Sequence, residues 1–314
     1  TQNTSVGGNA LYANTTGDNN VAVGHNALDA NTTASNNTAV GKDALTANTT
    51  ASDNTAVGRL ALSANTTGAH LVAVGTNALA ANTTASYNVA VGKGSLNANT
   101  TGNSNVGVGY NTLLVNTTAN NNTAVGHDSL KANTTGAQNT AVGRNVLPAN
   151  TTASSNTAIG ESAMAANTTG TDNVAIGANT LDANTTANNN TAVGRNALGA
   201  NTTGADNVAI GCDVLTANTT ADGNTAVGKS AGDALTTGTY NTIIGKEAGT
   251  FGTNLITGGT NTLIGSRVGT TATDSSEVVA MGYNMEGAAG YTTLGVGAAD
   301  IRAAHGNVTW ATVS

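Results

Sequence analysis

The sequence predicts an all-β fold, a parallel β-solenoid or β-roll made of 17-residue coils, and three features support this prediction. A Thr/Val-Ala-Val/Ile-Gly block recurs every 17 residues from Thr4 to Thr242, in fifteen copies without an insertion. Such a period fits a coil that stacks on itself in register, whereas the common helical repeats need roughly 33–47 residues. The unit is rich in Gly, Asn and Thr, which favour turns and strands over helices. Its Thr-Ala-Val segment alternates with the period of two that a short strand requires.

Residues that lie 17 apart form columns, and these columns predict how each coil closes. A glycine follows the Thr-Ala-Val segment, and an asparagine precedes nearly every Thr-Thr pair. We expect both to make corners, because glycine adopts positive φ and asparagine can hydrogen-bond to nearby backbone groups. We expect Val6, Val23, Val40 and their equivalents to face the interior, opposite a leucine column that begins with Leu11 and Leu28.

The composition predicts a lean interior and association between chains. Only 9% of the residues are charged and 3% aromatic, and 40 of the 314 residues are glycine. Such small side chains give little apolar burial against an ordering cost of about 1–2 kcal/mol per residue. Alanine-rich columns on the outside of the coils would suit close packing of identical chains. We therefore expect a parallel homotrimeric fibre.

The regular rhythm changes beyond Gly245, which predicts two parts. Residues 1–245 form the repeat shaft, and residues 246–314 form an irregular β cap or tip, as repeat arrays need atypical terminal units. Most of the aromatic residues lie near this end: Tyr240, Phe251, Tyr283, Tyr291 and Trp310. Two interpretations stay open, in which these rings either fill the core of the cap or contact a receptor at the tip.

The repeat N-T-A-V-G-x-x-A-L-x-A-N-T-T-G resembles repeats in phage tail-fibre proteins, and it is also similar to those in the heads of trimeric autotransporter adhesins. The segment from Gly306 to Ser314, G-N-V-T-W-A-T-V-S, resembles the junction that precedes the endosialidase-type intramolecular chaperone of phage tail spikes and fibres. In that family the precursor trimerises and cuts itself directly after a serine. The resemblance therefore implies a homotrimer and a processing site at Ser314.

The sequence offers no constellation for catalysis, for a cofactor or for a metal. The net charge of −7 leaves no basic footprint for nucleic acid, and the one cysteine, Cys212, excludes an intrachain disulfide. His25 and His127 share a column but lie six coils apart, roughly 29 Å at about 4.8 Å per coil, which is too far to share a metal. No apolar run approaches the roughly 20 residues that span a bilayer, so we expect no membrane insertion.

Together these features predict a structural fibre with a receptor-binding tip rather than an enzyme. The resemblance implies a phage tail fibre that binds a host cell-surface glycan or protein, on the virion or at an extracellular surface. A bacterial trimeric surface adhesin head is the alternative, because the same architecture serves it. An ice-binding solenoid is a further alternative, although adjacent threonines such as Thr15 and Thr16 should point to opposite faces.

Overall fold

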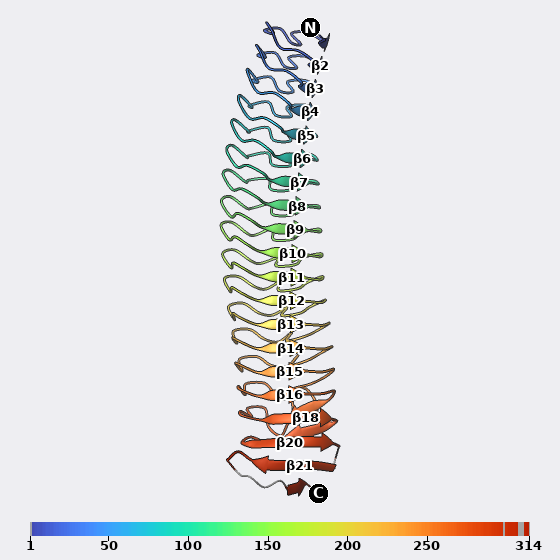
Figure 1. The fold of residues 1–314 in the computed structure, drawn as a ribbon, viewed down its shortest axis with the longest axis vertical. Coiled ribbons are helices and arrows are strands. Elements are labelled where there is room, and N and C mark those ends of the chain that lie inside the picture. Colours follow the sequence, from blue (N-terminus) through green and yellow to red (C-terminus); the bar gives the residue numbers. More distant parts are fainter. Residues whose placement is uncertain (1, 298, 307–310, 314) are drawn as a thin grey trace. The chain divides into compact units, whose positions relative to one another are not determined.

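The computed structural model describes residues 2–297, 299–306 and 311–313 and confirms an all-β parallel solenoid (Figure 1). These residues fall into two compact units, residues 1–156 and residues 157–314, which we call the N-terminal and C-terminal units. In both units a coil contributes one short strand and then turns, and successive strands pair in parallel. The described residues contain no helix.

The N-terminal unit stacks nine three-residue strands. Each residue pairs with its equivalent 17 residues later, as Val21 does with Thr38 and Ala22 with Ala39. The strands are β1 (Thr4–Val6), β2 (Val21–Val23), β3 (Thr38–Val40), β4 (Thr55–Val57), β5 (Val72–Val74), β6 (Val89–Val91), β7 (Val106–Val108), β8 (Thr123–Val125) and β9 (Thr140–Val142).

The C-terminal unit continues the same pattern and then becomes irregular, as predicted for the tip. The step from β15 to β16 is 20 residues, since Thr242 pairs with Thr262, and β20, β21 and β22 pair antiparallel. β17 and β19 form a separate two-stranded sheet. The strands are β10 (Thr157–Ile159), β11 (Val174–Ile176), β12 (Thr191–Val193), β13 (Val208–Ile210), β14 (Thr225–Val227), β15 (Thr242–Ile244), β16 (Thr262–Ile264), β17 (Val268–Thr270), β18 (Val279–Tyr283), β19 (Met285–Gly287), β20 (Tyr291–Val296), β21 (Ala299–Ala304) and β22 (Ala311–Val313).

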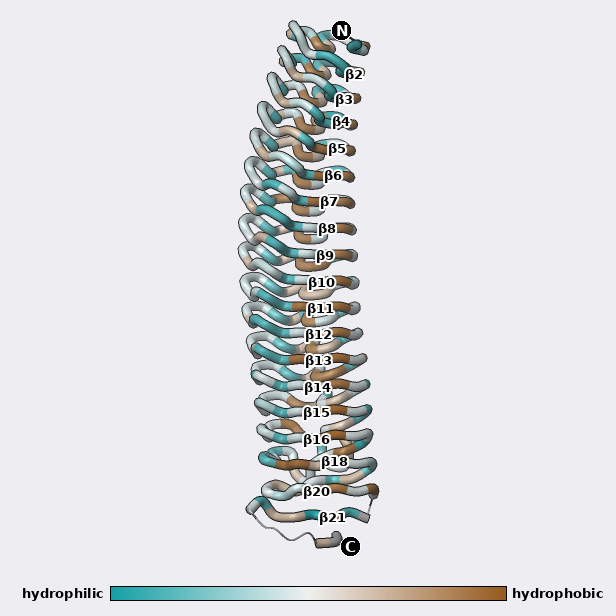
Figure 2. Tube along the Cα trace, viewed as in Figure 1, coloured by the Kyte–Doolittle hydropathy of each residue, from teal (hydrophilic) through white to brown (hydrophobic). Residues whose placement is uncertain are grey.

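The strands bury their alanine and expose their valine, so the expectation of an internal valine column is wrong. Ala22 and Ala39 are fully buried, whereas Val23 is half-buried and Ile176 is 37% exposed. The leucine column faces inward as predicted, with Leu28 fully buried. The coil is too thin for a second large side chain opposite each leucine. Alanine therefore lines the interior, and the valine column lies on the outer face of the sheet. Figure 2 shows a hydrophobic segment that recurs in strand after strand.

Two columns of buried asparagine run through the coils. The turn asparagine column precedes the Thr-Thr pair, and the strand asparagine column directly precedes most of the strands. In the turn column, Asn31 Nδ2 donates to the Ala34 carbonyl at 3.1 Å and to Asn14 Oδ1 at 2.9 Å. This confirms the predicted corner, in which an asparagine side chain replaces a backbone hydrogen bond.

The strand asparagine column joins each coil to the next. Asn122 Nδ2 donates to the Gly136 carbonyl at 2.9 Å, and Asn122 Oδ1 accepts from the backbone N–H of Asn139 at 2.9 Å. Asn122 also donates its own N–H to Asn105 Oδ1 at 3.0 Å. Each fully buried asparagine of this kind therefore satisfies backbone groups that the short strands leave unpaired.

Glycine is required where the coils come closest. Gly41 has a φ of +137°, and a Cβ there would lie 2.6 Å from the carbonyl oxygen of Gly58 in the next coil. No larger residue fits that distance without moving one coil away from the other. The glycine column therefore sets the tight stacking that the sequence predicted.

Replacing Asn122 tests the strand asparagine column. Asn122→Asp removes the donor to Gly136 and buries a charge, so we expect a loss of about 3 kcal/mol or more in the free energy of unfolding. Asn122→Leu leaves the Asn139 N–H and the Gly136 carbonyl without this partner, and we expect a loss of about 1–3 kcal/mol. Urea unfolding followed by circular dichroism measures both.

The matched control is Asn121→Asp, because Asn121 is exposed and Asp53 occupies the equivalent position of an earlier coil. We expect this control to change the stability by less than about 0.5 kcal/mol. Equal effects at positions 121 and 122 would contradict a structural role for the buried column.

Candidate functional site

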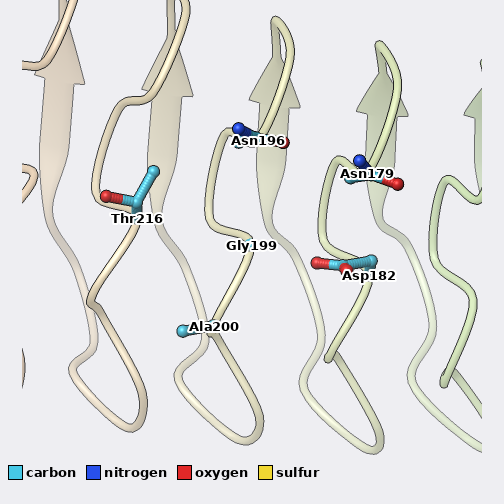
Figure 3. A pocket seen from close by; sticks show the side chains of 6 residues that line it. All are labelled: Asn179, Asp182, Asn196, Gly199, Ala200 and Thr216. Atoms are coloured by element: carbon cyan, nitrogen blue, oxygen red, sulfur yellow. The ribbon is translucent and has the colours of Figure 1, made fainter.

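A hollow of about 370 Å³ lies on the turns that follow β11, β12 and β13 (Figure 3). Each of the three turns supplies part of its wall. The lining residues are Asn179, Asp182, Asn196, Gly199, Ala200 and Thr216.

The hollow exists because one coil lacks a side chain. Gly199 occupies the column in which neighbouring coils carry Asp182 and Thr216. A Cβ at Gly199 would lie 3.4 Å from both Asp182 Oδ1 and the Asn196 carbonyl oxygen. The space that a side chain would fill is thus bordered by oxygen atoms.

The carboxyl group of Asp182 is the main electrostatic feature of this hollow. Burial raises the pKa of Asp182, and hydrogen bonds from the backbone at positions 182 and 183 partly offset the rise. Burial likewise raises the pKa of Asp233, helped by the nearby charges of Asp213 and Glu247. A single carboxyl group beside amides and a hydroxyl can hydrogen-bond to a neutral polar ligand.

Cys212 lies in a small hydrogen-bonded group with Arg195 and Asp213. The Cys212 thiol donates to Asp213 Oδ2 at 3.1 Å and accepts from the Arg195 guanidinium at 3.2 Å. The hydrogen bond from Cys212 lowers the pKa of Asp213, with further contributions from Asn196 and Arg195. Residues 2–297, 299–306 and 311–313 contain no group of three His, Cys, Asp or Glu side chains that could hold a metal ion.

The aromatic residues predicted for the tip do not meet in one cluster. Tyr240 is 66%, Tyr283 52% and Tyr291 37% exposed, so none of the three fills the core of a cap. Because Tyr283 pairs with Val296, Tyr291 lies five residues away at the other end of this strand pair, roughly 16 Å along it.

The remaining predicted site residues differ in their placement. Phe251 is half-buried, with the Arg267 guanidinium 4.7 Å from its ring centroid. Trp310 and the expected processing residue Ser314 lie outside the described residues.

Stacked rings in the N-terminal unit were not expected from the sequence. Tyr110 stacks on His127 with the ring centroids 5.0 Å apart, and Lys93 Nζ lies 5.8 Å from the Tyr110 centroid. His70 stacks on Tyr87 at 5.3 Å. The signal was present, because the members of each stack lie 17 residues apart and therefore share a column.

A second missed feature is the column that follows the glycine column, which we call the basic column. Seven of the ten Lys and Arg residues of the chain occupy it: Lys42, Arg59, Lys93, Arg144, Arg195, Lys229 and Lys246. All seven are exposed. The net charge of −7 does not reveal this arrangement, because a net charge says nothing about where along the chain the charged residues lie.

Comparison of the chain with protein-family models, curated proteins and solved structures gave no match. A search of the described ranges found no helix that is long and apolar enough to cross a membrane.

The hollow gives a prediction about pH. The folded pKa of Asp182 is raised above its ordinary value of 3.8, so the folded state binds the proton more tightly than the unfolded state. Stability is therefore lost as the pH rises from about 3.8 through the folded pKa. We expect Asp182→Asn to remove this penalty and to raise the free energy of unfolding at pH 7 by less than about 1 kcal/mol, because the group is partly solvated.

Urea unfolding at pH 7 and pH 3 checks this expectation. At pH 3 the carboxyl group is protonated in both states, and the variant and the parent protein should be equally stable. A variant that is less stable at pH 7, or equally stabilised at both pH values, would contradict the assignment.

Proposed function

We propose that this protein is a structural fibre that assembles as a parallel homotrimer and presents a receptor-binding tip. One observation supports the assembly most strongly, namely the valine column on the outer face of the sheet, whose valines are mostly half-buried and whose isoleucines are mostly exposed. Chains of this kind would serve as a phage tail fibre, on the virion or at an extracellular surface, and bind a host cell-surface glycan or protein.

The exposed apolar residues are concentrated in this column. Ile159, Ile176, Ile210 and Ile244 are 37–40% exposed, and all four are the third residue of a strand. Single exposed apolar side chains are normal, but a contiguous row marks an interaction surface. Water is excluded from such a row when another chain covers it.

Because the interior of each coil buries little apolar surface, packing of another chain on the valine column would add to the stability of the fold. Besides glycine, a coil such as that of residues 38–54 buries three alanines, one leucine and two asparagines. Each square ångström of apolar surface removed from water contributes about 25 cal/mol. When the valine columns of several chains pack together, apolar surface that is exposed in a single chain is removed from water.

The C-terminal unit supports the proposed receptor contact. Tyr283 and Tyr291 are exposed, and the Arg302 guanidinium lies 5.5 Å from the Tyr291 centroid. Exposed aromatic rings beside a cation suit the ring faces and hydroxyl groups of sugars as well as protein surfaces. The similarity of the repeat and of the terminal segment to phage tail fibres agrees with this role.

A bacterial adhesin head would use the same architecture and stays the alternative. The structure gives no support to ice binding, because Thr32 and Thr49 donate their hydroxyls to carbonyls of the next coil. One member of each Thr-Thr pair is therefore already hydrogen-bonded within the solenoid.

Charges on the valine column should prevent assembly. We expect the double substitution Val91→Asp with Val108→Asp to leave the fold intact, because both side chains point outward, and to convert a trimer into monomers. Multi-angle light scattering at micromolar concentration measures the mass. The control is Thr101→Asp with Thr118→Asp, two exposed positions of the same coils away from the sheet, and it should remain trimeric. A monomeric parent protein would refute the proposed assembly.

Removal of aromatic rings tests the tip. We expect Tyr283→Ala with Tyr291→Ala to weaken binding to an array of bacterial surface polysaccharides and lipopolysaccharides at least tenfold, since stacked aromatic contacts carry much of such binding. Tyr12→Ala, which removes a more exposed ring from the N-terminal unit, should bind like the parent protein. Unchanged binding by the double variant would place the receptor contact elsewhere.

A further inference from the structure

The outer face of the sheet has two edges that differ in charge. The outward side chains of each strand are its first and third residues, which together form the strand face. The basic column follows the strands by two residues. A largely exposed column precedes the strands by two residues and a mostly half-buried column by three, and we call these two columns the acidic edge. Their charged members are Asp18, Asp53, Asp172, Asp206, Asp222 and Glu277, and no Lys or Arg occurs among them.

We infer that a second copy of this chain packs on the strand face with its solenoid axis pointing in the same direction, so that its acidic edge lies against the basic column. This inference rests on the proposed parallel homotrimer and adds the contact between the two charged edges.

The periodicity of the strand face identifies its partner. In the N-terminal unit the face presents two outward side chains per coil, repeated at about 4.8 Å over nine strands. A partner that contacts every coil needs the same repeat over the same length. Another copy of this chain has that repeat, whereas an ordinary globular surface does not.

The size of the face also fits an interface between copies. Nine strands at about 4.8 Å spacing and roughly 7 Å of outward width give an apolar strip of about 300 Å². A stable interface buries about 800 Å² on each partner, so the strip alone is too small. When the basic column and the acidic edge are included at a similar width each, the surface that one copy could bury rises to roughly 900 Å². The charged edges must therefore take part in the contact.

Charge decides the orientation of the copies. When two copies pack face to face with antiparallel solenoid axes, the rotation axis that relates them lies across the strip and places basic column against basic column. When they pack parallel, in a pair or around a threefold axis, the basic column of one copy meets the acidic edge of the next. Like charges in contact are unfavourable and opposite charges are favourable, so the parallel arrangement is selected.

Part of the basic column makes no ion pair among the described residues, although the charge of Lys229 acts on Asp213. Lys42 pairs with Asp43 at 3.7 Å and Arg195 with Asp213 at 3.0 Å. By contrast, Arg59 and Lys229 make no ion pair among the described residues. Lys229 belongs to the coil whose strand is preceded by Asp222, so the two charges of neighbouring parallel copies lie at the same level.

Distances between spin labels test the orientation. In a Cys212→Ser background, Thr33→Cys and Thr152→Cys place labels at equivalent exposed positions, seven coils or about 34 Å apart in the N-terminal unit. Pulsed electron paramagnetic resonance is recorded on chains labelled at 33, on chains labelled at 152, and on co-expressed mixtures of the two. Parallel packing gives equal same-site distances and a mixed distance that exceeds both.

The outcomes separate this inference from the proposed function. Antiparallel solenoid axes never give a mixed distance longer than both same-site distances. A mixed distance no longer than the longer same-site distance would therefore overturn the inference and the parallel orientation of the proposed homotrimer, while leaving an assembled fibre. A protein that is monomeric in the same sample would overturn both the inference and the proposed homotrimer.

A charge exchange tests the edges themselves. We expect Lys229→Glu and Asp222→Lys to lower the temperature at which the trimer dissociates when each is present alone. Their combination restores the opposite pairing between copies and should recover at least half of the loss. The absence of any recovery, with both single variants correctly folded by circular dichroism, would show that these edges do not meet.

Discussion

The strand asparagine column is the interaction on which the rest of this fold depends. A strand of three residues makes too few backbone bonds to hold a coil, and the turns leave further carbonyls and N–H groups unpaired. Asn37 supplies what is missing, because its Nδ2 donates to the Ala51 carbonyl at 3.0 Å and its Oδ1 accepts from the Asn54 N–H at 3.0 Å. One side chain thereby closes its own layer and fixes the register of the next.

The asparagine column also explains the small interior. A coil that is closed by side-chain amides needs little width, and the remaining space takes one leucine with alanines around it. The close approach of glycine backbones follows from the same narrow section. Since the leucine already fills most of the interior, the valine and isoleucine that end the strands lie on the outer face of the sheet. The surface that supports the proposed assembly is therefore a consequence of how the interior is closed.

The sequence predicted the architecture well because identical residues recur at a constant spacing. The 17-residue coil, the inward leucine column and the glycine corners follow from periodicity and from the turn chemistry of Gly and Asn. The sequence could not decide between Ala22 and Val23 for the interior, since an alternating pattern is equally consistent with either face. The size of the side chain determines which of the two residues faces the interior, and this can be judged only when the width of the coil is known.

The candidate sites were harder to predict for physical reasons. The hollow at Gly199 arises from one missing side chain between two coils, and nothing in the local sequence marks it. The exposure of Tyr283 and Tyr291 depends on the ends of β18 and β20 rather than on residue type. The basic column, by contrast, is visible as soon as residues 17 apart are aligned.

An interruption in the strand asparagine column allows a direct measurement of its role. Leu71 replaces the asparagine of that coil, so the Asn88 N–H lacks the side-chain acceptor that the Asn105 and Asn122 N–H groups find in Asn88 and Asn105. Residue-resolved hydrogen exchange of the native protein distinguishes these amides. The account predicts slow exchange at Asn105 and Asn122 and exchange at least tenfold faster at Asn88. Equal protection at all three positions would contradict the claim that asparagine side chains hold the coils in register.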